Sequence, residues 1–159
     1  YTLTRAIAHV MDGLKESQRK CLFASFKKLA KGECKVAQLA SFVAEHSMYL
    51  HGEVSLSKTI TGMCQNFVGS NNIPLLHGNG QFGTRLMNGK DAASPRYIYA
   101  AMPDITRVLF PEIDDSLLTH RIVEGNRLLG KCQRRCRICA VHLDKPLRKR
   151  RQKTHHGSR

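Results

Sequence analysis

The segment KVAQLASFVAEHS (residues 35–47) carries the clearest helical pattern in the chain. Its apolar side chains recur at the spacing of one helix face, which leaves the opposite face polar; they are Val36, Leu39, Ala40, Val43 and Ala44. The segment ESQRKCLFASFKKLA (residues 16–30) has the same pattern, and a third helix is predicted from about residue 54 to residue 67. Because only short breaks separate these helices, they predict a helix-turn-helix bundle.

Glycines become frequent after this bundle. Between residues 69 and 95 they separate short segments, as they do in turns and β-hairpins; they are Gly69, Gly78, Gly80, Gly83 and Gly89. A further short helix is predicted over residues 102–110, with Pro103 in its first turn. A helical bundle followed by a glycine-rich hairpin region indicates an α+β fold of the winged-helix type. We expect this domain to span residues 1–118 and a connector to span residues 119–130.

The positive charge of the chain is concentrated at its C-terminal end. The formal net charge is +14, and ten of these charges lie in residues 131–159, where eleven Lys or Arg residues accompany one acid, Asp144. We expect this basic, cysteine-containing tail to be disordered, because it has few core-like positions. The charge indicates a polyanionic partner, but charge alone does not separate DNA from RNA or from an anionic membrane surface.

The six cysteines do not indicate a disulfide framework. Cys21, Cys34 and Cys64 lie in or beside helical patterns, where a reduced cysteine acts as a small apolar residue. The tail has C-x3-C-x2-C spacing, which leaves loose thiols and a zinc site completed by His142 as alternatives. Its segment KPLRKRRQK (residues 145–153) fits either a nuclear-localisation or DNA-binding patch or a solvated basic run. Without a signal-peptide pattern or a long apolar stretch, we expect an intracellular protein in a reducing compartment.

The segment GKDAASPRYIY (residues 89–99) holds the strongest candidates for chemistry. Pro95 restricts Ser94 to an extended conformation, so Arg96 and Tyr97 are predicted to lie at an exposed edge or in a loop. An arginine beside a tyrosine suits phosphoryl transfer, because the guanidinium neutralises phosphate oxygens while the phenol attacks. A phenol is almost fully protonated at neutral pH, so the attack needs a base, a cation or a metal. The spacing by itself leaves an ordinary strand tyrosine beside a solvated arginine as the alternative.

Five segments, in order along the chain, carry a resemblance to a known family: MDGLKESQRK (residues 11–20), KVAQLASFVAEHSMYLHGE (35–53), QNFVGSNN (65–72), GQFGTR (80–85) and GKDAASPRYIY (89–99). Together they resemble the breakage–reunion region of eukaryotic or viral type IIA DNA topoisomerases, from about residue 5 to residue 118. The resemblance implies that Tyr97 forms a transient 5′-phosphotyrosyl link to cleaved DNA and that Arg96 contacts the scissile phosphate region. It implies that His51 accepts the phenolic proton or bonds to the phosphate; a capping or turn histidine is the alternative.

The resemblance also implies contacts along the DNA backbone. Five basic residues are expected to bind DNA phosphates: Arg5, Lys15, Arg19, Lys35 and Arg85. Asp12 is expected to support them by orienting Arg19 or Lys15, since a carboxylate facing DNA would repel it. No metal ligand is expected in this chain.

For the complete enzyme, the resemblance implies ATP-dependent passage of double-stranded DNA by a homodimer in the nucleus, or in a viral factory if the source is viral. Mg²⁺ and ATP are expected to bind metal-binding and ATPase parts that this chain lacks, and no membrane partner is expected. The resemblance ends at RLLGKCQRRC (residues 127–136), which suggests a fragment or a misread gene product without full activity alone. The alternative function is a non-catalytic winged-helix DNA-binding protein in which Tyr97 is idle.

Overall fold

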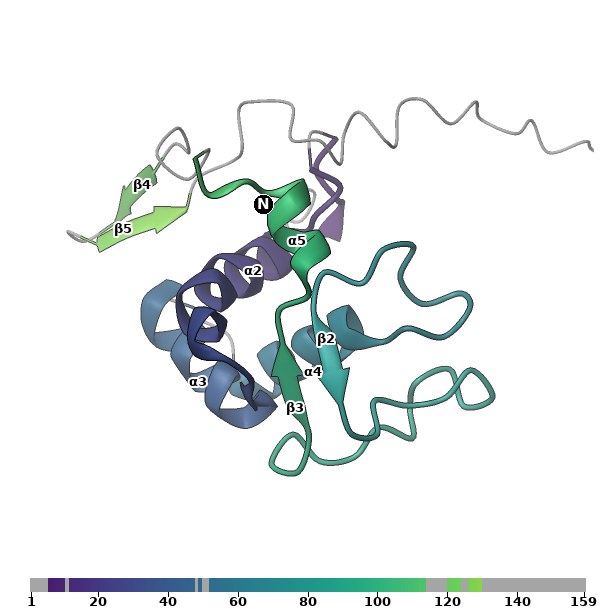
Figure 1. Cartoon of the computed structure of the whole chain (residues 1–159). Coiled ribbons are helices and arrows are strands. Elements are labelled where there is room, and N and C mark those ends of the chain that lie inside the picture. The colour runs from purple at the N-terminus through teal and green to yellow at the C-terminus, as the bar shows by residue number, and fades with distance from the viewer. Residues whose placement is uncertain are drawn as a thin grey trace, which may run out of the picture.

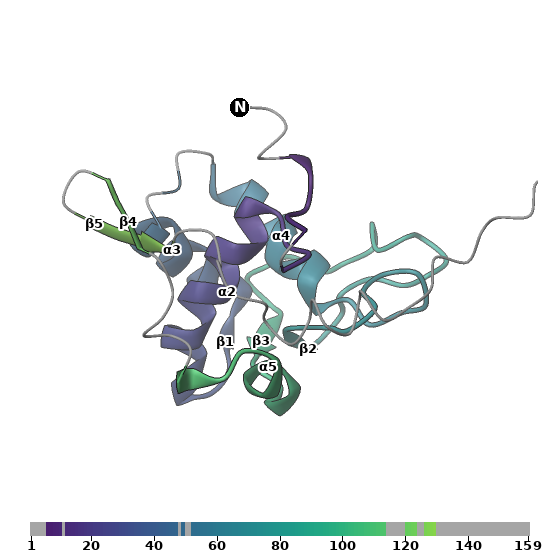
Figure 2. The same ribbon diagram turned by 90° about the horizontal axis from the view of Figure 1, so that it is seen from above.

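The computed structural model describes residues 6–10, 12–47, 49, 52–113, 120–123 and 126–129. Three helices form the body of this part of the chain: α2 (Glu16–Lys28), α3 (Val36–Ser47) and α4 (Glu53–Cys64). They pack against one another in a bundle, and a small sheet lies along one side of it (Figures 1 and 2). All three helices lie where the apolar periodicity predicts them.

The helix ends differ from the predicted ones by a few residues. α2 ends at Lys28 and continues as a 3-10 turn, η1 (Leu29–Lys31). α3 begins one residue later than predicted, because Lys35 belongs to a strand. α4 ends at Cys64, because Gln65 adopts an extended backbone and its side-chain amide bonds to a carbonyl outside the helix.

The core lies between the three helices and the sheet. Its fully buried side chains come from all three helices and from the residues directly before β2 and β3: Cys21, Val36, Leu39, Val43, Leu56, Ile60, Leu76 and Ile98. Burial raises the pKa of both the Cys21 and the Cys64 thiols to about 12. Both cysteines are free thiols, and at neutral pH they act as small apolar residues, as the sequence predicts.

The sheet has three short antiparallel strands in the order β1–β3–β2; they are β1 (Cys34–Lys35), β2 (His77–Asn79) and β3 (Tyr99–Ala101). Tyr99 in the central strand is paired with Lys35 on one side and with Asn79 on the other. β1 precedes α3, and the other two strands follow α4. This order of elements is a winged helix, which confirms the predicted fold class, and α3 and α4 form its helix-turn-helix.

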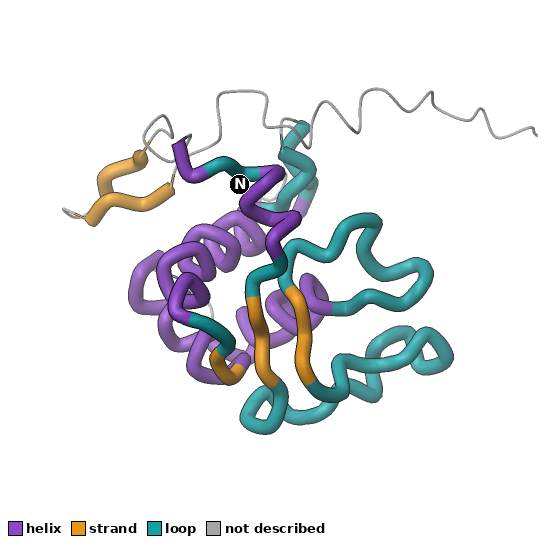
Figure 3. The backbone as a smooth tube through the Cα atoms, viewed as in Figure 1, coloured by secondary structure: helices purple, strands orange, loops and turns teal. Residues whose placement is uncertain are grey.

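Two long loops, residues 65–76 and 80–98, extend beside the sheet (Figure 3). The second loop joins β2 to β3, and we call residues 80–98 the wing. A short helix, α5 (Asp104–Leu109), follows β3. The predicted helix over residues 102–110 is present but shorter, because Pro103 has an extended backbone and stands directly before the helix rather than in its first turn.

The predicted connector, residues 119–130, contains two paired strands, β4 (His120–Val123) and β5 (Asn126–Leu129). β5 lies next to α2 and α3. Strands of four residues are too short for an alternating pattern to reveal them in the sequence. The basic tail predicted at residues 131–159 lies outside the described residues. None of the described helices has the length and apolar content needed to cross a membrane.

Candidate active site

Tyr97 lies in a tight turn near the end of the wing, two residues before strand β3. The turn spans residues 95–97, and the Tyr97 amide donates to the carbonyl of Ser94 at 2.9 Å. The Tyr97 side chain is 76% exposed, and Arg96 beside it is also exposed. Both residues therefore lie in an exposed loop, as the proline before them predicts.

The backbone on both sides of Tyr97 is fixed to the first turn of α3. The carbonyl of Pro95 accepts from the amide of Ala37, and the carbonyl of Ile98 accepts from the amide of Val36, each at 3.0 Å. These two amides have no partner inside the helix, because they belong to its first turn. Ile98 is 1% exposed and packs in the core. The phenol therefore projects into solvent from a backbone that is fixed on both sides.

The first residue of the wing, Gly80, packs directly against Ile98. Gly80 has φ of +119°, a conformation that side chains rarely adopt. A Cβ at this position would lie 2.9 Å from Cγ2 of Ile98. Across the base, the amide of Ala93 donates to the carbonyl of Gln81 at 2.9 Å. The absence of a side chain at Gly80 thus lets the backbone approach Ile98, the residue after Tyr97, closely.

Further along the wing, polar side chains hold its two halves together. Asp91 accepts from both the amide and the hydroxyl of Thr84, each at 2.8 Å. The hydrogen bond from the Thr84 amide, assisted by the one from its hydroxyl, lowers the pKa of Asp91. Gln65, which follows α4, donates to the carbonyl of Phe82 at 2.9 Å and to that of Gly89 at 3.4 Å. Hydrogen bonds therefore join the two halves of the wing to each other and join the wing to the end of α4.

Three of the predicted basic residues lie on or beside the wing and have exposed side chains: Lys35, Arg85 and Arg96. Lys35 is the strand partner of Tyr99, and its Nζ lies 5.9 Å from the centroid of the Tyr99 ring. The pairing of β1 with β3 therefore brings Lys35 to the strand that begins two residues after Tyr97.

Arg19 and Asp12 form an ion pair away from the wing. The Arg19 Nε donates to Oδ2 of Asp12 at 2.6 Å, and Nη2 donates to Oδ1 at 2.8 Å. The Arg19 side chain is 12% exposed and that of Asp12 is 2% exposed. Asp12 also accepts from the amide of Leu14 at 3.0 Å, so it holds the segment before α2 in place.

The structure does not bring Lys15 to the tyrosine. Lys15 is exposed and precedes α2 directly, and Gln18 accepts from its backbone amide at 2.9 Å. In Figure 1 the first turn of α2 lies in the middle of the fold near α5, whereas β3 begins at the lower edge. Arg5 and His51 lie outside the described residues.

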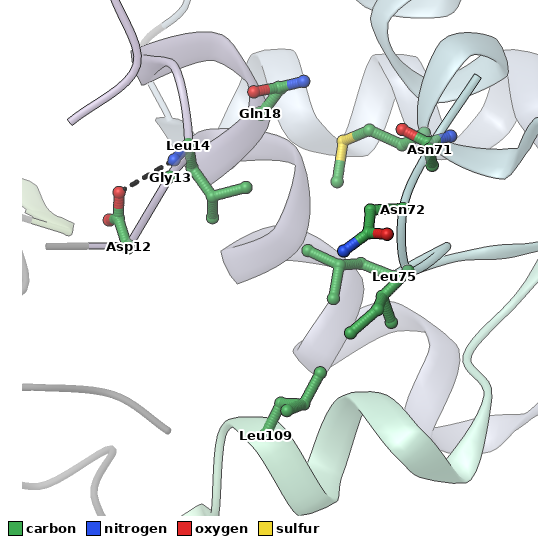
Figure 4. Close-up of a pocket in the computed structure, with 10 residues that line it drawn as sticks. Asp12, Gly13, Leu14, Gln18, Asn71, Asn72, Leu75 and Leu109 are labelled. Atoms are coloured by element: carbon green, nitrogen blue, oxygen red, sulfur yellow. Dashed lines mark hydrogen bonds between the residues drawn. The ribbon is translucent and has the colours of Figure 1, made fainter. Parts of the chain in front are cut away.

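A cavity of about 150 Å³ lies beside the beginning of α2. Its lining comes from the segment before α2, from α4 and the loop after it, and from α5 (Figure 4). Asp12 is the only predicted site residue in that lining, and its carboxylate faces Arg19 and the Leu14 amide. This cavity contains no residue of the wing.

The described residues do not fit a metal site. Within them, no group of three or more His, Cys, Asp or Glu side chains comes together in a way that could hold a metal ion.

Two residues that support the site were not singled out from the sequence. Gln65 and Asp91 each lie inside a segment that carried the family resemblance, QNFVGSNN and GKDAASPRYIY respectively. Both are polar residues next to a glycine-rich loop, where hydrogen bonds to loop backbone are common. That position is the only signal in the sequence that could have found them.

Comparison with known proteins gives the family. The sequence family described as DNA gyrase/topoisomerase IV matches residues 5–126, more than three quarters of the chain. The chain belongs to this family. The match confirms the resemblance to type IIA topoisomerases, and it extends beyond residue 118, through β4 to the first residue of β5.

Curated relatives are closely similar over the same region. DNA topoisomerase 2 of Arabidopsis thaliana is 54% identical over 126 residues, and DNA topoisomerase 2-beta of Gallus gallus is 59% identical over 124 residues. These alignments cover 79% and 78% of this chain, but only 9% and 8% of the two relatives. The mitochondrial DNA topoisomerase 2 of Dictyostelium discoideum is 53% identical and has 10% of its length covered. The chain therefore spans about a tenth of the length of these topoisomerases.

A solved topoisomerase structure has the same fold. It is the DNA-binding, cleavage and re-ligation domain of Plasmodium falciparum topoisomerase II, which superposes with a TM-score of 0.80 at 47% sequence identity. The match covers 86% of this chain and 18% of that structure. The winged helix described above is thus similar to one part of a larger topoisomerase domain.

Proposed function

We propose that this chain is the tyrosine-bearing part of a type IIA topoisomerase and that Tyr97 breaks and rejoins DNA strands. The phenolic oxygen of Tyr97 attacks a backbone phosphorus, and the bond from phosphorus to the 3′ oxygen breaks. The 3′ oxygen leaves with a proton as a hydroxyl, while the phosphate stays on Tyr97 as a 5′-phosphotyrosyl ester. Attack by the 3′ hydroxyl reverses the step and reseals the strand.

One observation carries this proposal: the exposed phenol sits on a backbone that α3 fixes on both sides. A nucleophile gains rate when it is held in line with its target, because the cost of ordering it has been met before the reaction. Arg96 is adjacent and exposed, so its guanidinium is available to neutralise the attacked phosphate. We assign His51 as the acceptor of the phenolic proton.

The remaining basic residues are proposed to hold the DNA backbone. Lys35 and Arg85 are exposed on the wing side of the fold and would contact phosphates directly. Arg5 and Lys15 are proposed to do the same before α2. Because Asp12 takes up its guanidinium, Arg19 is expected to act on DNA binding indirectly, by ordering that segment.

The salt dependence of DNA binding tests the direct contacts. Each phosphate contact adds about 0.9 to the slope of log affinity against log salt concentration. Lys35→Gln should therefore lower the slope by about one. Arg19→Gln should weaken binding mainly by destabilising the fold. It should therefore lower the melting temperature but leave the salt slope close to that of the wild type. Equal slopes for wild type and Lys35→Gln would remove Lys35 from the proposed contacts.

For the complete enzyme we propose the properties that family membership implies. It would act as a homodimer that passes one DNA duplex through another, with Mg²⁺ and ATP bound by parts other than this chain. We propose the nucleus, or a viral factory for a viral source, as its location, although one relative is named as mitochondrial.

Covalent trapping on DNA tests the role of Tyr97. The full chain is mixed with Mg²⁺, the metal-binding part of a related topoisomerase and duplex DNA labelled at one 3′ end, and then denatured. We expect the 3′-labelled strand to become linked to the protein, and a duplex labelled at the 5′ end to release a labelled piece with a free 3′ hydroxyl. The chain with Mg²⁺ but without the metal-binding part should bind DNA without forming the adduct.

Two tyrosine variants provide the contrast. Tyr97→Phe should abolish the adduct, whereas Tyr99→Phe should keep it, because Tyr99 is a half-buried strand residue two positions away. Adduct formation by Tyr97→Phe would exclude Tyr97 as the nucleophile. DNA binding by the wild type without any adduct, even with the metal-binding part present, would favour the non-catalytic winged-helix alternative.

A further inference from the structure

The tip of the wing exposes two large apolar side chains. We call residues 85–90 the wing tip. Within it, the side chain of Leu86 is 92% exposed and that of Met87 is 52% exposed. Two residues with positive φ follow them, Asn88 at 51° and Gly89 at 75°, and these turn the chain back toward the fold. Covering exposed apolar side chains with a partner removes apolar surface from water, which is energetically favourable.

The wing tip is held rigidly. At its neck the backbones of Gly83 and Gly89 touch, since a Cβ at Gly83 would lie 2.6 Å from the Cα of Gly89. The amide of Gly89 also donates to the carbonyl of Thr84 at 2.9 Å. Asp91 and Gln65 tie the same neck through their side chains. Insertion of a preorganised tip costs little conformational entropy, which favours its use in binding.

The charges around the wing tip suit a polyanion. Arg85 and Lys90 flank the apolar pair and are both exposed. The one acid of the wing, Asp91, has its carboxylate bonded to Thr84 at the neck. An apolar tip between two cations matches duplex DNA, whose phosphates border grooves from which apolar side chains can enter between stacked base pairs.

We propose that Leu86, supported by Met87, is a wedge that enters a DNA groove and partly unstacks a base step near the strand attacked by Tyr97. The inference rests on the proposed function, because the wing that carries the tip also carries Tyr97 and Arg96. Arg85 and Lys90 hold the flanking phosphates while the leucine enters. Proteins that deform duplex DNA use apolar side chains of this kind to open a base step.

Fluorescence of 2-aminopurine tests the wedge. The base analogue is placed at successive positions of a duplex, and its fluorescence, which rises on unstacking, is recorded with and without the full chain. The wild type should raise the signal at one or two neighbouring positions. Leu86→Ala should lose this rise and bind the duplex about tenfold more weakly, as expected for one leucine side chain removed from an apolar contact. Leu86→Phe should keep the rise.

Controls separate a wedge from a general loss of apolar surface. Val108→Ala removes a side chain that is 55% exposed on α5, and it should leave both binding and unstacking unchanged. Leu86→Ala should melt at the wild-type temperature, because the side chain it removes is 92% exposed. Its salt dependence should also match the wild type, since no charge changes.

Any outcome other than those expected contradicts the proposed wedge. Unstacking by Leu86→Ala equal to that of the wild type, or no unstacking by wild type bound to DNA, refutes it; covalent trapping at Tyr97 would still stand in both cases. A chain that binds no duplex at all refutes the wedge and the proposed function together. If Leu86→Ala leaves unstacking intact but abolishes self-association in ultracentrifugation, or binding to anionic vesicles, the tip contacts a protein or a membrane surface instead.

Discussion

Replacement of Gly80 by alanine tests how firmly the base of the wing holds the tyrosine. Gly80 adopts φ of +119°, and its open side faces Ile98, the residue that follows Tyr97. An alanine there would place its Cβ 2.9 Å from Cγ2 of Ile98, closer than carbon atoms normally pack. Ile98 has little room to move, because it is 1% exposed and its carbonyl bonds to the first turn of α3.

Two costs set the size of the effect. A non-glycine residue held at this positive φ costs about 1–3 kcal/mol, and forcing a methyl group into a packed core costs about 1–3 kcal/mol. We therefore expect Gly80→Ala to lower the free energy of unfolding by about 2–6 kcal/mol. A domain whose stability lies well inside the ordinary range of about 5–15 kcal/mol would still be folded. Relief of the clash would shift Ile98 and Tyr97, so covalent trapping should fall by more than DNA binding does.

Urea unfolding followed by circular dichroism measures the stability change, and Gly62→Ala is the matched control. Gly62 lies inside α4, has no positive φ, and a Cβ there would meet no atom within 4 Å. Alanine favours helix over glycine, so Gly62→Ala should stabilise the chain by about 0.5–1 kcal/mol. A Gly80→Ala variant within about 0.5 kcal/mol of wild type, or one that traps DNA as well as wild type, would falsify the close-approach argument.

Three further predictions concern stability and reactivity. Asp12→Asn should lower the free energy of unfolding by about 3 kcal/mol, because it leaves the largely buried Arg19 without its anion; a change below about 1 kcal/mol in urea titration would contradict this ion pair. Hydrogen bonds lower the pKa of Asp91, so its stabilisation is present above the unfolded value of about 4 and is lost as the pH falls through the lower folded value. The stability advantage of wild type over Asp91→Asn should therefore shrink below about pH 4, and a gap that widens there would reverse the assigned sign. Burial raises the pKa of Cys21 and Cys64 to about 12, so iodoacetamide at pH 8 should modify both thiols only after the chain unfolds. Peptide mass spectrometry measures the modification. Rapid labelling of the native chain would show that these cysteines are not in the core.

Local sequence pattern was enough to predict the helices, in which the apolar spacing repeats over several turns. The helix over residues 36–47 follows from apolar spacing alone, since five residues on one face need a core to cover them. The exposure of Tyr97 follows from its neighbour, because Pro95 removes a donor and disfavours continued regular structure. Five segments in a fixed order were also enough to identify the family.

Pairs that are distant in sequence could not be found in this way. Gln65 reaches the carbonyl of Gly89, 24 residues further along the chain, and no periodicity links the two. β1 has only two residues, so no alternation marks Cys34–Lys35 as a strand. The family resemblance left open whether Asp12 orients Arg19 or Lys15, and only the fold shows that Asp12 bonds to Arg19.

The amino-acid sequence by itself determined the three helices, the family and the exposed position of Tyr97, because each depends on residues that are neighbours along the chain. Tertiary structure decided how that tyrosine is held: by carbonyl groups bonded to α3, by a glycine that admits Ile98, and by a wing tied to the end of α4. These contacts join segments tens of residues apart. They form only when the core brings the segments together, so no local pattern encodes them.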